Sequence, residues 1–494
     1  MSQVSIAEII STQWLIPGVY NKFDPSRALR GPREMPRSLL LWGQITSPMF
    51  NPANFNKRMT VTTDAEARGL LGSGSILYQM WRGAKDNSGL GLPIRVMPLQ
   101  DNSTGIANVR TITVTTSGSR GSGEQAVYIG GDRYSVGVQA ADTAAQIAAK
   151  LGAALNVGDN PFTVAVNAAV ITLTAKNKGT LANTIDIRTA LYDSDNDVLG
   201  VTLAIAQSTA GAVDPSLSAA IVNTQNSRDT EWVVPYTDGA NMAMVDAELL
   251  RRWGQDVQSD VCVITAMRGT EGTHTTWLAS RNNPLMHSIH TANDPTSPFV
   301  TAAMAGAAIE TAASLDPAVP HEGIPLVGYK AAREDEFLQS TQINNIMLAG
   351  GSSLSVQSDG TATLMRMVTH YKTHNTGAYD ESMRELCWIK TLSWFRWFRN
   401  TLFAIRTQGF KMGEYAKPID GQKIMTLEIA HDMLMNIYGD AVTLGRMQNS
   451  DHYEKTMLIQ IDGPRGRLKI QDEPVLMTQL HQTMITSMWA AGHV

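Results

Sequence analysis

Cysteine is nearly absent from this sequence: Cys262 and Cys387 are the only two in 494 residues. Two isolated cysteines exclude a disulfide framework and a Cys-x-x-Cys metal site, and they favour synthesis in a reducing compartment. No uninterrupted apolar run reaches about 18 residues, so we expect no helix that spans a membrane. The opening residues 1–18 lack the basic cluster of a secretory signal peptide. We therefore expect a protein that is made in the cytoplasm and has no membrane partner.

Charge is also scarce, at 17% of the residues, and it sums to −5. A slightly acidic chain is poorly suited to nonspecific binding of nucleic acid, so we expect no nucleic-acid partner. A surface with few charges is available for contact with other proteins. Because the chain is too long for one comfortable core, we expect two to four domains.

Complete metal-site motifs are missing. His370 and His374 have the spacing of a zinc-protease helix, but Tyr371 stands where the general-base glutamate belongs. The acidic segment 193–197 resembles the start of an EF-hand loop, yet the loop lacks both the central glycine and the final glutamate. Four further histidines fall outside any metal-ligand spacing and are interpreted as ordinary: His274, His287, His290 and His321. We expect no metal and no other cofactor.

Motifs for phosphate binding and nucleophilic catalysis are incomplete as well. The glycine-rich segment 69–74 has no Lys-Ser or Lys-Thr pair for a phosphate loop, and segment 118–123 precedes a strand instead of a helix. No Gly-x-Ser-x-Gly elbow occurs. The sequence therefore offers no catalytic residue, and we expect a protein that is not an enzyme.

Short apolar runs separated by helical periods indicate an α/β core. Continuous apolar runs of this length are typical of strands buried on both faces; they lie at 39–43, 232–236 and 261–265. The segment 92–97 is predicted to close a first β-α-β unit. Helices are predicted at 242–253, 274–285 and 300–313, and an edge strand at 324–328. The core is assigned to residues 38–100 and 216–372.

Between these two stretches, residues 101–215 are rich in Thr, Ala, Gly and Val and poor in aromatics. Alternating segments at 110–115, 126–136 and 163–175 predict strands, and 143–155 predicts a small Ala-rich helix. Since neither end of this region reads as a chain terminus, we predict an α+β domain inserted into the core.

The last 120 residues predict a different domain, assigned to 373–474. It has a long aromatic helix at 379–406, a second helix at 423–444 and a hairpin over 453–470. Aromatic and basic residues alternate at 394–399. Core packing is the favoured interpretation of this pattern, an interface with arginines at its rim is the alternative, and nucleic-acid stacking is the least favoured.

Both ends of the chain read as extended arms. Prolines punctuate residues 1–37 and prevent a helical core there. A disordered tail is the alternative, but apolar residues such as Trp14 and Tyr20 favour docking. Residues 475–494 carry an imperfect alternation over 475–488, which predicts a terminal strand in need of a partner.

Several motifs stand in a characteristic order along nearly the whole chain: 16–20, 24–28 and 39–44 near the start, 128–134 and 173–183 in the insert, then 323–326, 345–351, 359–361 and 366–371. In their order and spacing they resemble the contractile phage tail sheath proteins of the Mu-like family. The resemblance implies an open α/β core of subtilisin-like topology split by a β-rich, outward-facing insert, with a C-terminal α+β domain and extended arms, and no protease activity attached.

The resemblance also implies a function. Sheath subunits polymerise as stacked hexameric rings around a tail tube, in contact with baseplate and tail terminator proteins, and contract to drive the tube through the host envelope for DNA ejection. The protein is then part of the virion and is assembled in the host cytoplasm. The sheath of a phage-derived injection particle and a hydrolase on a subtilisin-like core are the alternatives.

Site residues follow from the same resemblance. Exchanged arm strands would use Trp14, Ile16, Val19, Tyr20, Phe23, Val475, Met477, Leu480 and Met484. The hairpin that receives them would present Met457, Ile459, Ile461, Leu468 and Ile470. Candidate contacts to the tube are Arg396, Arg399, Arg406 and Lys411.

Overall fold

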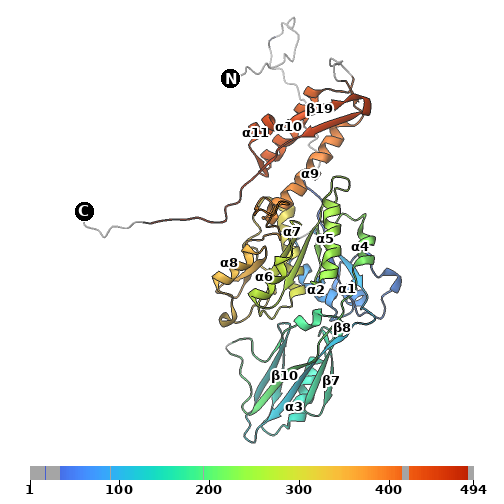
Figure 1. Cartoon of the computed structure of the whole chain (residues 1–494). Coiled ribbons are helices and arrows are strands. Elements are labelled where there is room, and N and C mark those ends of the chain that lie inside the picture. The colour runs from blue at the N-terminus through green and yellow to red at the C-terminus, as the bar shows by residue number, and fades with distance from the viewer. Residues whose placement is uncertain (1–16, 18–33, 90, 193, 414–421, 488–494) are drawn as a thin grey trace, which may run out of the picture.

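The computed structural model describes residue 17 and residues 34–89, 91–192, 194–413 and 422–487. Figure 1 shows an elongated chain with three parts in a row. A central part built on a large sheet lies between a β-rich part at one end and a mainly helical part at the other. The predicted arm residues Trp14, Ile16, Val19, Tyr20 and Phe23 lie outside the described residues.

An eight-stranded sheet organises the central part. Its spatial order is β15 (Ala362–Leu364), β14 (Ser352–Val356), β13 (Met286–His290), β12 (Cys262–Met267), β11 (Glu231–Val233), β1 (Leu39–Gln44), β3 (Ile94–Leu99) and β2 (Met59–Thr60). The six inner strands are parallel, and the two edge strands pair antiparallel with their neighbours. Every residue of β1 is buried, as expected for a parallel strand covered on both faces. The mixed α/β, multidomain architecture predicted from the sequence is confirmed.

Helices cover this sheet: α1 (Asp64–Leu71), α2 (Ile76–Asp86), α4 (Ser218–Thr224), α5 (Gly239–Trp253), α6 (Glu271–Ala279), α7 (Pro298–Leu315) and α8 (Ser340–Leu348). Helix α7 packs against α2, β1 and β12. It is the one described helix long and apolar enough to cross a membrane by length and composition, but 72% of it is buried within the protein. It also carries Glu310, which is ion-paired inside the core, so α7 is the central helix of a packed domain.

Two predictions for the central part are wrong. The helix predicted at 274–285 ends at Ala279, and the buried strand β13 follows it. Strand β13 was not predicted because it carries the polar residues His287, Ser288 and His290, which are unusual in a buried strand. Hydrogen bonds inside the protein satisfy His287 and Ser288. The edge strand predicted at 324–328 is reduced to a single bridge between Pro325 and Thr363.

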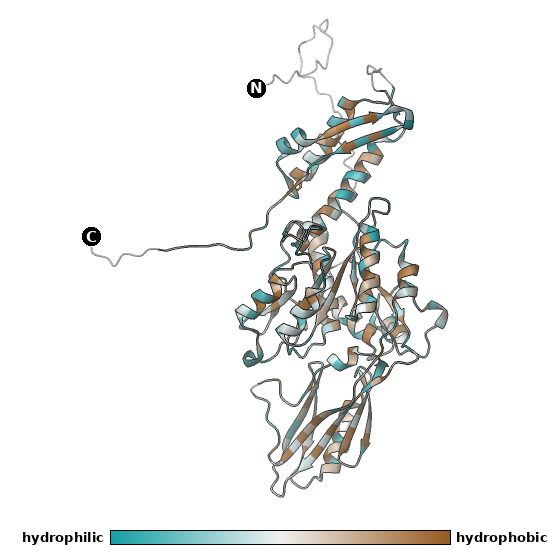
Figure 2. Cartoon of the chain, in the orientation of Figure 1, coloured by the Kyte–Doolittle hydropathy of each residue, from teal (hydrophilic) through white to brown (hydrophobic). Residues whose placement is uncertain are grey.

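The β-rich part contains two sheets and one helix. The larger sheet has the order β10 (Val201–Thr209), β4 (Ala107–Thr116), β8 (Val170–Lys178) and β7 (Phe162–Asn167). The smaller has the order β6 (Asp132–Val138), β5 (Gly123–Ile129) and β9 (Ile187–Arg188), and α3 (Ala144–Leu155) packs on both sheets. Figure 2 shows apolar and polar residues alternating along the strands of this β-rich part. Gly130 and Gly131 both have positive φ, which the two-residue turn between β5 and β6 requires.

The helical part begins on α9 (Leu386–Thr407) and continues with α10 (Leu427–Thr443) and α11 (Ser450–Thr456). Its short strands are β16 (Lys411–Met412), β17 (Ile424–Met425), β18 (Met447–Gln448), β19 (Leu458–Asp462), β20 (Arg467–Gln471) and β21 (Val475–Leu476). The predicted helix therefore starts at Leu386 and not at residue 379. The predicted strand starts at Leu458, because Asn449 caps α11 and the buried Tyr453 ring stacks on Tyr438 at 3.8 Å.

The C-terminal segment also differs from its prediction. Val475 and Leu476 form β21, which pairs antiparallel with Gln448 and Met447 of β18. The start of the predicted lone strand is thus paired within its own chain. After Leu476 the described residues have no regular secondary structure, and Figure 1 shows them extending away from the molecule.

Candidate assembly interface

Helix α9 belongs to two hydrophobic cores at once. Leu386 and Ile389, near its start, pack in the core of the central part. Phe395 and Leu402, farther along, pack in the separate core of the helical part. Because the same continuous helix is buried at both ends, it links the two parts as a stiff connection instead of a flexible linker.

A buried charge network fixes α9 to the central sheet. The ammonium of Lys390 contacts the carboxylates of Glu231 on β11 and Glu310 on α7. Glu310 also pairs with Arg37 at 3.4 Å, and Glu231 accepts or shares a hydrogen bond with His287 at 2.8 Å. All five side chains are buried. Burial alone would lower the pKa of Lys390, but the surrounding anionic groups outweigh it and hold that pKa above its usual value, so Lys390 is charged at neutral pH.

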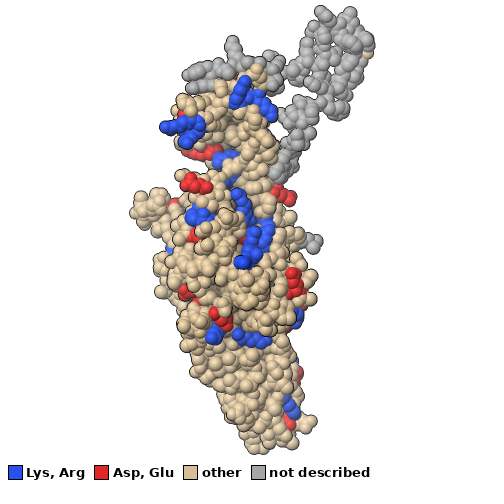
Figure 3. Space-filling model, turned by 90° about the vertical axis from the view of Figure 1, so that its right-hand side faces the viewer, with Lys and Arg blue, Asp and Glu red and all other residues tan. Residues whose placement is uncertain are grey.

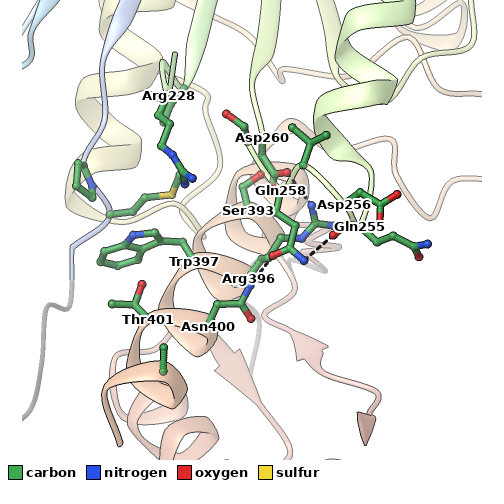
Figure 4. A pocket seen from close by; sticks show the side chains of 16 residues that line it. Arg228, Gln255, Asp256, Gln258, Asp260, Ser393, Arg396, Trp397, Asn400 and Thr401 are labelled. Carbon is green, nitrogen blue, oxygen red and sulfur yellow. Dashed lines mark hydrogen bonds and ion pairs between the residues drawn. The ribbon is translucent and has the colours of Figure 1, made fainter. Parts of the chain in front are cut away.

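A groove of about 560 Å³ lies between α9 and the loop at residues 255–260. Figure 4 shows Arg396 reaching Asp260 across it, at 2.7 Å, and Asn400 bonded to Gln258 at 2.8 Å. The guanidinium of Arg396 also lies 4.5 Å from the centre of the Trp253 ring. The side chain of Arg396, a predicted tube contact, is therefore already bound to groups of its own chain.

The other candidate tube contacts are placed similarly. Arg399 pairs with Asp472 at 2.6 Å, and Arg406 pairs with Asp440 at 3.2 Å. Lys411 is exposed at the start of β16, where its ammonium donates to the Gln422 side chain. On the face drawn in Figure 3, Lys and Arg gather over the central and helical parts, whereas the β-rich end is almost free of charge. Of the four residues predicted to meet a tube, Lys411 is the most accessible.

The predicted receiving hairpin is a two-stranded sheet. Strands β19 and β20 pair only with each other among the described residues, so each has one edge without a backbone partner. Its predicted contact residues have different positions. Met457, just before β19, and Ile461 are buried. Ile459 and Ile470 are half-buried against the core of the helical part. Leu468 is also half-buried. An added strand would therefore be bound through the backbone of an open edge, with few of these side chains free to contact it.

The C-terminal arm provides a matching unpaired segment. Val475 is half-buried in β21, and Met477 lies at its end. Farther out, Leu480, Met484 and Ile485 are 76%, 91% and 80% exposed. Large apolar side chains this exposed mark the segment as a candidate contact surface.

A serine between two histidines lies in the core. The Ser288 hydroxyl on β13 is 2.9 Å from Nε2 of His274 and 3.0 Å from Nε2 of His370. All three residues are fully buried, so the hydroxyl has no access to a substrate. Among the described residues, no group of three or more His, Cys, Asp or Glu is arranged to hold a metal. The sequence missed this cluster because its members are up to 96 residues apart and follow no motif.

Three buried histidines, His274, His290 and His321, predict that acid destabilises the protein. Burial lowers the pKa of His274 and His321 to about 3 and that of His290 to about 4. The unfolded chain takes up protons below about pH 6.5 while these native imidazoles stay neutral. Stability is therefore retained above that pH and lost below it, by about 1.4 kcal/mol per pH unit for each histidine.

Urea unfolding between pH 7 and pH 5 measures this loss. His321→Leu should reduce the slope of stability against pH, whereas Asn344→Ala, at an exposed position without a titratable side chain, should leave it unchanged. A slope that is the same in wild type and His321→Leu would contradict the assignment.

Comparison with known proteins agrees with the motif resemblance. No family model matches the chain. The chain is 26% identical over 453 residues to the Mu-like prophage FluMu tail sheath protein of Haemophilus influenzae, which covers 90% of this chain and 91% of that protein. A solved chain of the anti-feeding prophage baseplate is similar in fold, with 10% identity, a TM-score of 0.50 and coverage of 97% of this chain and 100% of that one.

A sheath tail protein from Desulfitobacterium hafniense matches with 13% identity and a TM-score of 0.45, over 93% of this chain and 100% of that one. The sequence relationship extends over nine tenths of both chains and therefore includes the central sheet, the insert and the helical part together. The chain is thus a relative of the Mu-like phage tail sheath proteins, as its motifs predicted.

Proposed function

We propose that this chain is the structural subunit of a contractile tail sheath of a Mu-like phage. The relationship to a Mu-like tail sheath protein over 90% of the chain is the observation that carries the proposal. The exposed apolar arm and the open hairpin edges support it, because a protein that acts alone has no use for either. No catalytic step is part of this function, and the buried Ser288 supports its absence.

Subunits are joined by exchange of arm strands in this proposal. The C-terminal arm of one copy adds to an open edge of the β19–β20 hairpin of another, and the N-terminal arm segment 12–24 joins the same sheet. Backbone hydrogen bonds hold the added strands, while the arms themselves can bend. Stacked hexameric rings around a tail tube are the expected assembly, with the baseplate and tail terminator proteins at its two ends.

Contraction needs no chemical fuel in such an assembly. The extended sheath is a metastable arrangement, and triggering at the baseplate lets each ring reach a state with more buried contacts. Free energy stored in each subunit adds up along the tail and drives the tube through the host envelope for DNA ejection. The proposal places the protein in the virion after assembly in the host cytoplasm, with the insert facing outward and a subtilisin-like topology for the core.

The sheath of a phage-derived injection particle is the second candidate, favoured by the fold shared with a chain of the anti-feeding prophage baseplate. A hydrolase that uses Ser288 is disfavoured, since this serine lies between two histidines but has no exposed surface. A serine-directed covalent probe should leave the folded protein unlabelled.

Electron microscopy of the overexpressed full-length chain tests the proposal. We expect hollow tubes of helically stacked subunits in the absence of any other phage protein. Deletion of residues 1–24 should leave soluble subunits that do not polymerise. A protein that stays monomeric at high concentration in both forms would refute the sheath assignment.

A further inference from the structure

The C-terminal arm is held at its root by the core of its own chain. Trp388 of α9 donates its indole N–H to the Gln479 side-chain oxygen at 2.5 Å. The Gln479 amide in turn donates to the carbonyl of Ala318 at 2.9 Å, in the loop after α7. One arm residue thus bridges two elements of the central part that are 70 residues apart in sequence.

His481 makes a second attachment two residues later. Its Nδ1 is hydrogen-bonded to the Glu322 carboxylate at 2.9 Å, and its Nε2 approaches the Glu385 carboxylate to 3.4 Å without a hydrogen bond. The other carboxylate oxygen of Glu385 is occupied by Arg366, with Nε at 3.0 Å, so Glu385 presents one fixed oxygen to the imidazole. Glu385 is buried at the start of α9, and His481 is largely covered although it lies on an extended arm.

The attachments stop abruptly after this point. Every described residue from Gln482 to Ser487 is exposed, including the apolar Met484 and Ile485. Val475 and Leu476, before the attachments, are paired with β18. The arm therefore has a paired segment, a bound root and a free end, and only the free end lacks a partner among the described residues.

We infer that Gln479 and His481 are positioning residues that bind the arm root to its own core, so that the segment donated to a second copy of this chain begins at Gln482 and not at Val475. The inference rests on the proposed exchange of arms. It also means that the central part and α9 set the direction in which the arm leaves, although the arm starts in the helical part.

The physical advantage is entropic. A chain end that is free from residue 477 onward samples many directions, and fixing each of its residues on docking costs conformational entropy. A root that is already held in the free subunit has lost this freedom before docking. Binding to the second copy is then stronger for the same contacts.

Spin labels measure the position of the root directly. The two native cysteines are buried, so cysteines introduced at Leu480, between the two attachment residues, and at Asn344, both exposed, accept labels selectively. Distances are measured in the full-length chain, on the subunit-sized fraction collected by size exclusion. We expect a narrow distance distribution in the parent protein and a distribution roughly twofold broader or more in Q479A/H481A.

Two further variants make the test specific. Glu322→Ala removes one partner of His481 without altering the arm and should also broaden the distribution. His452→Ala removes a similar histidine–carboxylate pair, with Glu473 at 3.2 Å, but leaves the contacts of Gln479 and His481 intact, so the distribution should stay narrow. A broad distribution in the parent protein, or an unchanged one in Q479A/H481A, would overturn the inference.

Sedimentation of the same proteins separates this inference from the proposed function. Q479A/H481A should need a roughly tenfold higher concentration than the parent to form polymers. If the distance distribution is narrow in the parent and broad in Q479A/H481A, but neither protein polymerises, the root attachment would be supported and the sheath function refuted. Polymers that form equally well in both proteins would refute the attachment as a positioning device.

Discussion

Removal of residues 482–494 is expected to convert the protein from a polymer into soluble single subunits. The described part of this segment, residues 482–487, is exposed, so the deletion should leave the melting temperature of the subunit nearly unchanged. In a polymer, however, each subunit would lose the strand that it donates and each hairpin the strand that it receives. Analytical ultracentrifugation and electron microscopy of the truncated and full-length proteins measure the difference.

A point variant keeps the chain length and tests the same contact. Met484→Asp with Ile485→Asp places two charges on the apolar free end and should abolish polymers as the truncation does. Val222→Asp makes the same change at an exposed apolar residue of α4, in the central part, and serves as the matched control. Polymers of normal length from the truncated protein would show that the C-terminal arm does not join the subunits.

Replacement of Lys390 by alanine should strongly destabilise the central part. It leaves Glu231 and Glu310 buried, with less positive charge to compensate them. Breaking a buried ion pair by removing one partner costs about 3–5 kcal/mol, because the remaining charge is uncompensated. Chemical denaturation of the subunit, monitored by circular dichroism, gives this difference in the free energy of unfolding.

Charge-matched variants identify the cause. The quadruple change R37M/K390M/E231Q/E310Q removes the buried acidic and basic charges together and should recover much of the lost stability. Lys150→Met breaks an ion pair with Asp142 on the surface of the insert and should have little effect. If Lys390→Ala were no more harmful than Lys150→Met, the network would not be what fixes α9 to the sheet.

The sequence predicted the parts of this molecule that depend on local pattern. Residues 39–43 and 261–265 are continuous apolar runs, and both are inner strands of the parallel sheet. The Gly130–Gly131 turn and the Ala-rich helix at 144–155 also follow local chemistry that is visible in a few residues. Helix α7 was found for the same reason.

What it missed depends on partners far away in sequence. Strand β13 was hidden because its buried polar residues look exposed until Glu231 and His274 are placed beside them. The arm root was predicted to be part of a free strand because His481 contacts Glu322 and Glu385, which lie about 100 residues or more upstream. Side chains satisfied over such separations leave no periodic signal along the chain.

Helix α9 acts as a lever with a fixed end at Lys390. From Lys390 to Thr407 it extends about 26 Å at 1.5 Å per residue. A tilt of about 10° at the fixed end would move the far end by roughly 4.5 Å, close to the distance between neighbouring strands of a sheet. Small rotations of the central part would thus become displacements of about one strand spacing at the hairpin. An arm from a second copy could follow this movement without detaching only if it bends beyond its root.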